Sequence, residues 1–156
     1  MIKFESENTT FSLRGVGVVI HNGKLLVQKR KDDKFWALPG GRVEMGEKSE
    51  LTPVRELEEE IGVKGFNVLR LLYVCESFFS FKGNNNHQIA FYYLLDCPAN
   101  FKYIGKYNFE GIEEGKNIVY TWLDLDNLEN EAIKPEFLKK ELKNIVPYPK
   151  HIIEEE

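Results

Sequence analysis

The segment 48–61 has apolar residues at helical spacing, and this pattern restricts the fold more than any other part of the sequence. These residues recur three or four positions apart and so share one face of a helix: Leu51, Val54, Leu57 and Ile61. Gly62 follows directly and favours a C-terminal stop, because glycine readily adopts the left-handed conformation that ends many helices. A helix with one apolar face must bury that face against other elements.

The sequence on both sides of this helix is typical of β-strands. Segments 11–20 and 25–30 are rich in aliphatic and β-branched residues, and the Asn22-Gly23 turn signal between them predicts a hairpin. Further strands are predicted at 35–38, 42–44, 66–79, 88–97 and 118–123, with a polar turn at 82–87. Pro135 opens a second amphipathic helix that ends near Ile145. Together these elements predict an α/β (α+β) fold, with a mixed β-sheet covered by helices on both faces.

Size and composition indicate one globular domain, which we expect to span residues 1–156, because 42% of the residues are hydrophobic and 29% are charged. No apolar run approaches the roughly 20 residues that a membrane-spanning helix needs, and residues 1–11 do not resemble a signal peptide. We therefore expect a cytoplasmic protein with no membrane partner. The net charge is −4 and no basic stripe is present, which argues against a nucleic-acid partner. Cys75 and Cys97 lie in apolar runs, and this favours reduced thiols.

Three glutamates share the helix face opposite the apolar one. At about 100° per residue, Glu59 and Glu60 fall on either side of Glu56. Like charges at these spacings repel, and the C-terminal end of a helix disfavours anions. A hard divalent cation would reverse this cost, because Mg²⁺ and Mn²⁺ prefer carboxylate oxygens. A solvated acidic face is the alternative interpretation, and the glutamates alone do not separate the two.

The surrounding residues favour the metal site. Pro39-Gly40-Gly41 is a loop with little side-chain bulk, so that its backbone can approach a ligand closely. Glu47 and Arg55 add an acid and a fixed cation to the same unit. Pro53 is unusual within a helix, and it costs little if the helix begins at 50–52, because proline is tolerated in the first turn.

The segment 41–63 resembles the Nudix box, the signature of the Nudix (MutT-like) hydrolase family. Gly41 is followed after five residues by Glu47, and seven residues later the chain reads Arg55-Glu56-Leu57-Glu58-Glu59-Glu60-Ile61-Gly62-Val63. The stretch 36–41 and the run Trp122-Leu123-Asp124 also look like features of this family. The resemblance implies the Nudix α/β/α sandwich, with a mixed β-sheet between helices.

The resemblance also implies roles for individual residues. Metal ligands would be Glu56, Glu59, Glu60, Glu47 and the Gly40 carbonyl, and the catalytic set would include Glu59, Glu60 and Arg55. Arg55 resembles the arginine that orients the carboxylates rather than contacting the substrate. Members of this family hydrolyse a diphosphate by water attack on phosphorus, and Mg²⁺ or Mn²⁺ neutralises the phosphate oxygens and lowers the pKa of the water.

Residues outside the box supply further candidates. Glu114 and Glu113, with Glu110 third, are candidates for an additional metal ligand or general base, although a polar loop also contains glutamates for solubility alone. Four residues are candidates for substrate binding, through base stacking or phosphate contact: Arg30, Phe79, Phe81 and His87. The alternative for the aromatic residues is that they are alternating core residues of two paired strands, and a loop histidine is more often structural.

From these features we expect a metal-dependent pyrophosphohydrolase. Its expected substrate is a small nucleoside diphosphate derivative, either a nucleoside triphosphate or an ADP-ribose-like nucleotide sugar, because the residues expected to recognise it are aromatic and neutral. The alternative is a catalytically silent Nudix domain that acts as a nucleotide-binding sensor. The sequence leaves open whether the chain forms a homodimer.

Overall fold

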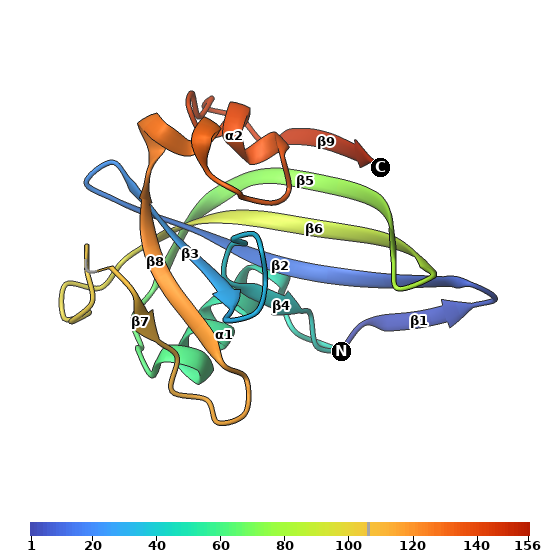
Figure 1. Ribbon diagram of the computed structural model, residues 1–156, viewed down its shortest axis with the longest axis horizontal. Helices are drawn as coiled ribbons and strands as arrows, with labels where there is room; N and C mark the ends of the chain where they lie inside the picture. The colour runs from blue at the N-terminus through green and yellow to red at the C-terminus, as the bar shows by residue number, and fades with distance from the viewer. Residues whose placement is uncertain (106) are drawn as a thin grey trace.

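The computed structural model describes residues 1–105 and 107–156, and within them a nine-stranded sheet runs through the molecule (Figure 1). The strand order is β7-β8-β3-β2-β6-β5-β9, and β1 and β4 pair with β2 outside this path. β2 pairs in parallel with β6, and β5 with β9, whereas the other pairs are antiparallel. The strands are β1 (Lys3–Ser6), β2 (Thr9–His21), β3 (Lys24–Arg30), β4 (Gly40–Arg42), β5 (Asn67–Phe81), β6 (Asn84–Asp96), β7 (Phe109–Glu110), β8 (Ile118–Asp124) and β9 (Lys150–Glu155).

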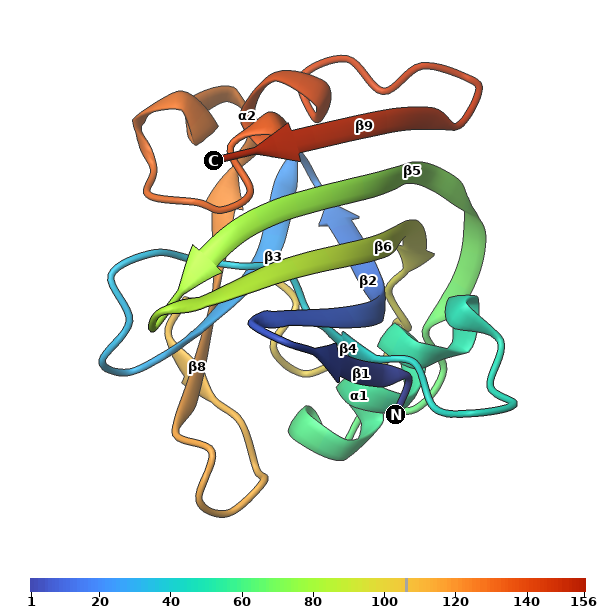
Figure 2. The ribbon, with the colours of Figure 1, turned by 90° about the vertical axis from the view of Figure 1, so that its right-hand side faces the viewer.

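Helical segments cover both faces of this sheet (Figure 2). The helix α1 (Thr52–Ile61) lies on one face, and the 3₁₀ turn η2 (Leu125–Asn130) and the short helix α2 (Phe137–Glu141) lie on the other. Successive strand residues point to opposite faces, so Val18 packs in the core beneath α2 while Val19 packs in the core beneath α1. The predicted fold, a mixed sheet between helices, is confirmed.

The predicted hairpins are present, with one change. β2 and β3 turn at Asn22 and Gly23, whose φ angles of 50° and 74° fit a two-residue turn. β5 and β6 are also joined by two residues, Lys82 and Gly83, so the predicted polar turn at 82–87 is wrong. The side chains of 84–87 are polar, but their backbone continues the ladder, because pairing extends to the tip of the hairpin.

Other predicted elements are shorter or displaced. Segment 35–38 forms isolated bridges instead of a strand, and the strand predicted at 42–44 begins two residues earlier as β4. The second helix is limited to Phe137–Glu141. The sequence pattern did not predict β1, β7 or β9, because two are very short and the third is a charged edge strand.

The helix α1 begins later than its apolar pattern predicts. A 3₁₀ turn, η1 (Ser49–Leu51), precedes it, and Pro53 lies in its first turn, where it costs little. Gly62 ends the helix with φ 71°, as predicted. Leu51 is 47% exposed, so it does not belong to the buried face, which is formed by Thr52, Pro53, Leu57, Glu60 and Ile61.

Glycines of β2 explain why the first turn of α1 packs so closely on the sheet. A Cβ atom at Gly15 would lie 2.8 Å from the Cβ of Thr52 and would overlap the Ser49 carbonyl oxygen. A Cβ at Gly17 would lie 3.1 Å from the Cβ of Pro53. α1 therefore rests on the bare backbone of β2, and this contact fixes the position of its glutamates.

Two further features are the state of the cysteines and the lengths of the helices. Cys75 is buried, Cys97 is half-buried, and both are free thiols. Across residues 1–105 and 107–156, none of the helices has the length and apolar character required to span a membrane.

Candidate active site

Glu56 and Glu60 form a close pair on the inner face of α1. Glu60 is only 4% exposed, and the hydroxyl of Tyr120 on β8 donates a hydrogen bond to its Oε2 at 2.6 Å. Glu56 lies directly over Gly41, where a Cβ atom would come within 2.6 Å of the Glu56 Cδ. The glycine backbone of β4 therefore contacts Glu56, and Tyr120 of β8 holds Glu60.

The electrostatics of this pair are unfavourable without a cation. Burial raises the pKa of Glu60 to about 7, and the charge of Glu56 adds to the rise, while the Tyr120 hydroxyl and the Lys116 ammonium oppose it. Burial, with Glu60 nearby, also raises the pKa of the Tyr120 hydroxyl, which therefore stays a hydrogen-bond donor. Two acids in a poorly solvated place repel each other, and a divalent ion between them would remove that repulsion.

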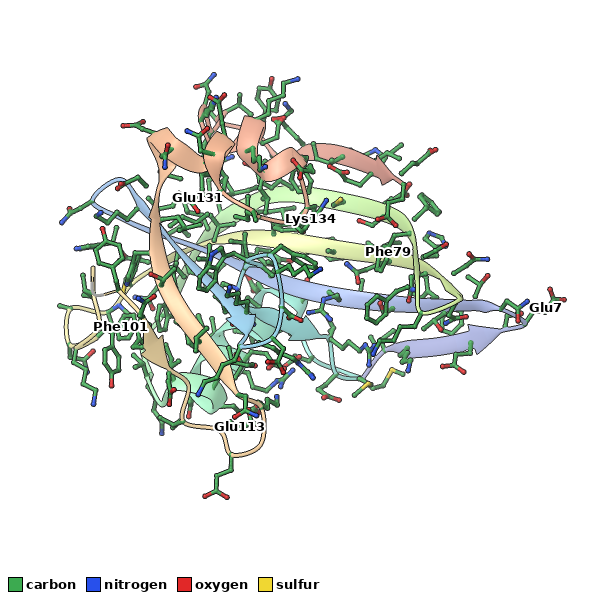
Figure 3. The ribbon with its side chains drawn as sticks, in the orientation of Figure 1. Glu7, Phe79, Phe101, Glu113, Glu131 and Lys134 are labelled. Atoms are coloured by element: carbon green, nitrogen blue, oxygen red, sulfur yellow. The ribbon has the colours of Figure 1, made fainter. Side chains whose placement is uncertain are left out.

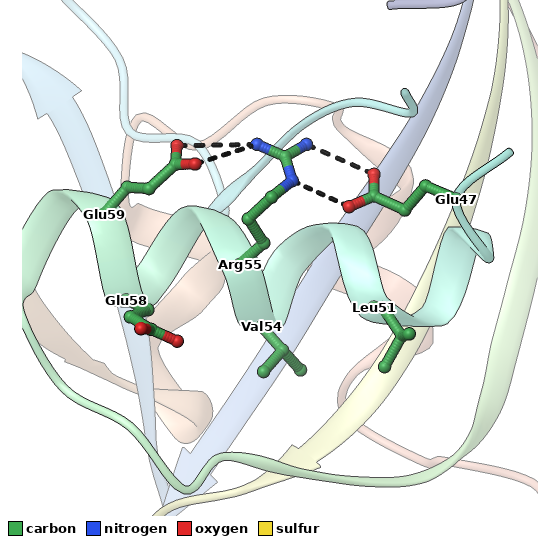
Figure 4. Close-up of a pocket in the computed structure, with 6 residues that line it drawn as sticks. All are labelled: Glu47, Leu51, Val54, Arg55, Glu58 and Glu59. Carbon is green, nitrogen blue, oxygen red and sulfur yellow. Dashed lines mark hydrogen bonds and ion pairs between the residues drawn. The ribbon is translucent and has the colours of Figure 1, made fainter. Parts of the chain in front are cut away.

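Arg55 links a second group of acids on the outer side of the helix (Figure 4). Its Nε and Nη2 donate to the two oxygens of Glu47 at 2.7 and 3.2 Å, and Thr52 Oγ1 donates to the same carboxylate at 2.7 Å. The hydrogen bond from Arg55 is the main reason that the pKa of Glu47 is lowered to about 2, and the same bond raises the pKa of Arg55.

The same guanidinium also reaches the other glutamates. Arg55 Nη1 donates to both oxygens of Glu59 at 3.4 Å (Figure 4). It also donates to Glu56 at 3.1 Å. Arg55 thus contacts three box glutamates, an arrangement that matches the orienting role implied by the family resemblance. That role remains a prediction.

Glu59 is separated from the buried pair. Its side chain is 47% exposed and turns towards Arg55, because residue 59 lies on the other side of Glu56 from residue 60 on the helix. Within residues 1–105 and 107–156, no group of three or more His, Cys, Asp or Glu side chains is arranged to hold a metal ion. The three glutamates share a face, as predicted, but only two of them converge.

Two converging carboxylates nevertheless fit Mg²⁺ or Mn²⁺. Mg²⁺ keeps several waters and is bound by one or two carboxylates together with substrate phosphates, so a complete protein cage is not required. Glu56 and Glu60 supply the carboxylates, and Gly40 lines the same cleft. Glu59 and Glu47 lie farther from this pair, and both form ion pairs with Arg55.

We expect Mg²⁺ to raise the melting temperature, and to raise it more at pH 8 than at pH 6. A carboxyl group whose pKa is raised on folding has no effect below about pH 4.5, but it lowers stability progressively as the pH rises to about 7. An ion bound to the charged pair would stabilise the folded state by mass action, and above pH 7 it would no longer have to displace a proton. Thermal melts at both pH values, with Mg²⁺ or with a chelator, provide the test. A shift of equal size at pH 6 and pH 8 would contradict the prediction, and Glu60→Gln should reduce it.

A cleft of about 410 Å³ lies beside the carboxylate pair. Gly40, Gly41, Glu56 and Glu60 line one part of it. The remainder is strongly cationic, with five basic side chains: Arg14, Lys29, Arg30, Arg42 and Lys116. The structure therefore places Arg30, predicted from the sequence to contact substrate, in the cleft with the acids.

The segment after β7 packs against the end of α1 and positions part of the predicted acidic loop. The backbone N–H of Ile112 donates to the Glu60 carbonyl at 2.7 Å. Lys116 lies between two acids, 3.8 Å from Glu60 and 3.1 Å from Glu113. Glu113 is thus linked to the site through Lys116.

The other two acids of this loop are less well placed. Glu114, the first choice from sequence, is exposed, and Glu110 pairs with Lys31 at 2.7 Å. The structure favours Glu113 over Glu114, because Glu113 is half-buried and paired with Lys116 whereas Glu114 is exposed. A role for any of the three in catalysis remains a prediction.

The aromatic candidates lie elsewhere. Phe79 and Phe81 are near the tip of the β5–β6 hairpin, and Figure 3 shows Phe79 well away from Glu113. His87 stacks on Phe78 at 4.5 Å and meets Phe11 edge-on at 5.3 Å. None of the three predicted residues lines the cleft. Phe79 and Phe81 lie opposite Asn86 and Asn84 in the strand register, and Phe81 is 60% exposed, so Phe81 is not a core residue either. Only His87, stacked on Phe78, pairs with an aromatic side chain of the neighbouring strand.

Several residues of the site were missed from the sequence. Tyr120 lies two positions before Trp122 in a predicted strand, a pattern that is typical of a core residue. Lys116 lies in the loop whose glutamates were considered. Arg14 interrupts an apolar strand, and Arg42 directly follows Gly40-Gly41. A lone charge in such a place could have indicated a site residue.

Comparison with known proteins agrees with this geometry. The model of the NUDIX domain family matches residues 12–147. An RNA pyrophosphohydrolase from Pelagibacter ubique is 31% identical over 128 residues, which cover 79% of this chain and 70% of the relative. A putative 8-oxo-dGTP diphosphatase from Bacillus subtilis is 47% identical over 51 residues, which are 31% of this chain and 34% of the relative.

The fold has matches among solved structures. A crystal structure of a MutT NUDIX hydrolase from Burkholderia pseudomallei matches with a TM-score of 0.51 and 25% sequence identity. The match covers 74% of this chain and 84% of the chain in that structure. The family model alone spans most of the chain and includes most of β2, the strands β3 to β8 and the glutamate helix α1. The chain belongs to the NUDIX domain family of hydrolases.

Proposed function

We propose that this protein is a metal-dependent pyrophosphohydrolase that cleaves the diphosphate bond of a small nucleoside diphosphate derivative. The observation that supports this most strongly is the Glu56–Glu60 pair, in which Glu60 is buried and Glu56 half-buried, and which lies beside the Gly40-Gly41 backbone of β4 in a cationic cleft. Carboxylates hold a divalent cation, whereas arginines and lysines bind phosphate oxygens. A cleft with both can hold a metal-bound diphosphate.

The residues around the pair would divide the chemistry between them. A bound Mg²⁺ or Mn²⁺ would neutralise phosphate charge and make a water molecule easier to deprotonate. Glu56 and Glu60 would hold that ion, with the Gly40 carbonyl as a third ligand, and Tyr120 fixes the orientation of the Glu60 carboxylate. Glu59 is the most exposed of the three acids on this face, and we assign it as the first candidate for the base that accepts the proton of the attacking water.

The names of the relatives leave two substrate sources open. One relative is named an RNA pyrophosphohydrolase and the other a putative 8-oxo-dGTP diphosphatase. For this chain we propose a small nucleotide, either a nucleoside triphosphate or an ADP-ribose-like nucleotide sugar. We further propose that residues 1–156 form a single domain that works in the cytoplasm.

Product analysis on a nucleotide panel tests the assignment. The purified protein is incubated with nucleoside triphosphates, ADP-ribose and a 5′-triphosphate oligoribonucleotide, each with Mg²⁺, with Mn²⁺ or with a chelator. We expect turnover with either metal and none with the chelator. Tight nucleotide binding without turnover under any of these conditions would instead support the silent sensor and overturn the proposed hydrolase.

A further inference from the structure

Two arginines face each other at the cleft. Arg14 on β2 and Arg42 on β4 are direct partners in the β2–β4 register, and both line the cleft. Like charges directly opposite on neighbouring strands destabilise a sheet. Within the described residues, neither guanidinium forms an ion pair with a carboxylate, whereas Arg55 contacts three glutamates.

The surroundings of this pair add to the cost of the two charges. Among the described residues, the Nε of Arg42 is buried without a hydrogen-bond partner, and its Nη1 contacts only the Met1 sulfur, at 3.4 Å. Burial lowers the pKa of Arg14 and the charge of Arg42 lowers it further, while the charges of Tyr92, Glu56 and Glu60 oppose this fall. An unsatisfied donor and two adjacent cations are unfavourable in the free protein, and an anion between them would satisfy both.

The charges of the residues that line the cleft indicate how much negative charge a ligand should carry. Five basic side chains face three acids, which are Asp33, Glu56 and Glu60. A divalent ion would neutralise the glutamate pair. Among the described lining residues, Asp33 would then be the one acid left to offset the five basic side chains. The cleft with metal therefore suits a polyanion better than a ligand with only two negative charges.

We propose that Arg14 and Arg42 bind the terminal phosphoryl group of a nucleoside 5′-triphosphate, so that the enzyme selects a 5′-triphosphate end over an ADP-ribose-like diphosphate. This inference rests on the proposed hydrolase function. A terminal phosphoryl has three free oxygens, enough to accept hydrogen bonds from two guanidinium groups at once. A diphosphate that is esterified at both ends has no such group. The aromatic residues at 79 and 81, expected to read a neutral base or sugar, lie outside the cleft.

The variants Arg14→Gln and Arg42→Gln test this assignment. We expect each to raise KM for a nucleoside triphosphate by about 10–100-fold with a much smaller change in kcat, because a bond to a charged group is lost in the bound substrate. KM for ADP-ribose should change little. Without ligand, the melting temperature of each variant should stay the same or rise, because a like-charge pair is removed.

The stability measurement separates substrate binding from a structural role. If the arginines only supported the fold, both variants would melt at a lower temperature and affect all substrates equally, and the inference would be overturned. Arg70→Gln is the matched control, since Arg70 on β5 donates to the Val146 carbonyl at 2.7 Å and lies outside the cleft. It should leave the KM values for both substrates unchanged.

The substrate panel separates this inference from the function on which it rests. A parent enzyme that prefers ADP-ribose to nucleoside triphosphates overturns the triphosphate assignment while the hydrolase stands. A parent protein that hydrolyses no substrate with either metal overturns both. A comparison of free nucleoside triphosphates with a 5′-triphosphate oligoribonucleotide identifies which source of the terminal phosphoryl group the enzyme prefers. A preference for either of them over ADP-ribose supports the inference.

Discussion

Replacement of Glu60 by glutamine is expected to lower kcat by about 10²–10⁴-fold, the range typical of a positioned catalytic group. The amide keeps the size of the side chain and still accepts the hydrogen bond from Tyr120, but it removes the negative charge that a divalent ion needs. The fold should persist, because Leu57 and Ile61, the apolar contacts of the same helix, are untouched. Steady-state kinetics over a range of Mg²⁺ concentrations, together with circular dichroism, would measure both effects.

Glu58→Gln is the control for this variant. Glu58 lies on the same helix, but Figure 4 shows it pointing away from Arg55 and Glu59. It lies outside the cleft and pairs with Lys64 at 3.6 Å. The same chemical change there should leave kcat within about twofold, since surface substitutions and exposed ion pairs have small effects. If Glu60→Gln turned over substrate at the parent rate, Glu60 could not be the metal ligand proposed here.

The largest expected effect on stability is that of Gly15→Ala. Its new methyl group would lie 2.8 Å from the Cβ of Thr52 and would overlap the Ser49 carbonyl oxygen, and neither can move without shifting the start of α1. Overpacking of this kind costs about 3 kcal/mol, which corresponds to a fall of roughly 6–12 °C in melting temperature for a chain of this length. The displaced helix should also weaken the Mg²⁺-dependent stabilisation.

Gly46→Ala separates steric overlap from loss of glycine flexibility. Gly46 has φ 81°, and none of the described residues beyond its chain neighbours comes within 4 Å of the position that a Cβ would take. Alanine there has only the backbone cost of about 1 kcal/mol. Differential scanning calorimetry of the two variants gives the comparison. Equal melting temperatures would show that α1 does not rest on β2 as tightly as the structure indicates.

Local patterns in the sequence were sufficient to predict the principal elements. The apolar period and Gly62 located the glutamate helix, and Asn22-Gly23 located the first hairpin, because both signals act between residues close along the chain. The box spacing identified the acids for the same reason. Leu51 was misplaced because the 3₁₀ turn shifts the start of α1, and periodicity alone does not locate the end of a helix.

The tertiary structure decided how the site is assembled from these elements. Pairing of β2 with β4 brought Arg14 opposite Arg42, and packing of β8 on α1 placed Tyr120 against Glu60. The length of the β5–β6 hairpin carried Phe79 away from the cleft. These relations depend on strand register and on contacts between distant segments, and no local period or turn signal contains that information. The sequence by itself determined that this chain carries a row of acids on a helix. Only the packing of that helix against the sheet brought two of them together, buried Glu60 and placed arginines in the same cleft, because burial and proximity are properties of the folded chain.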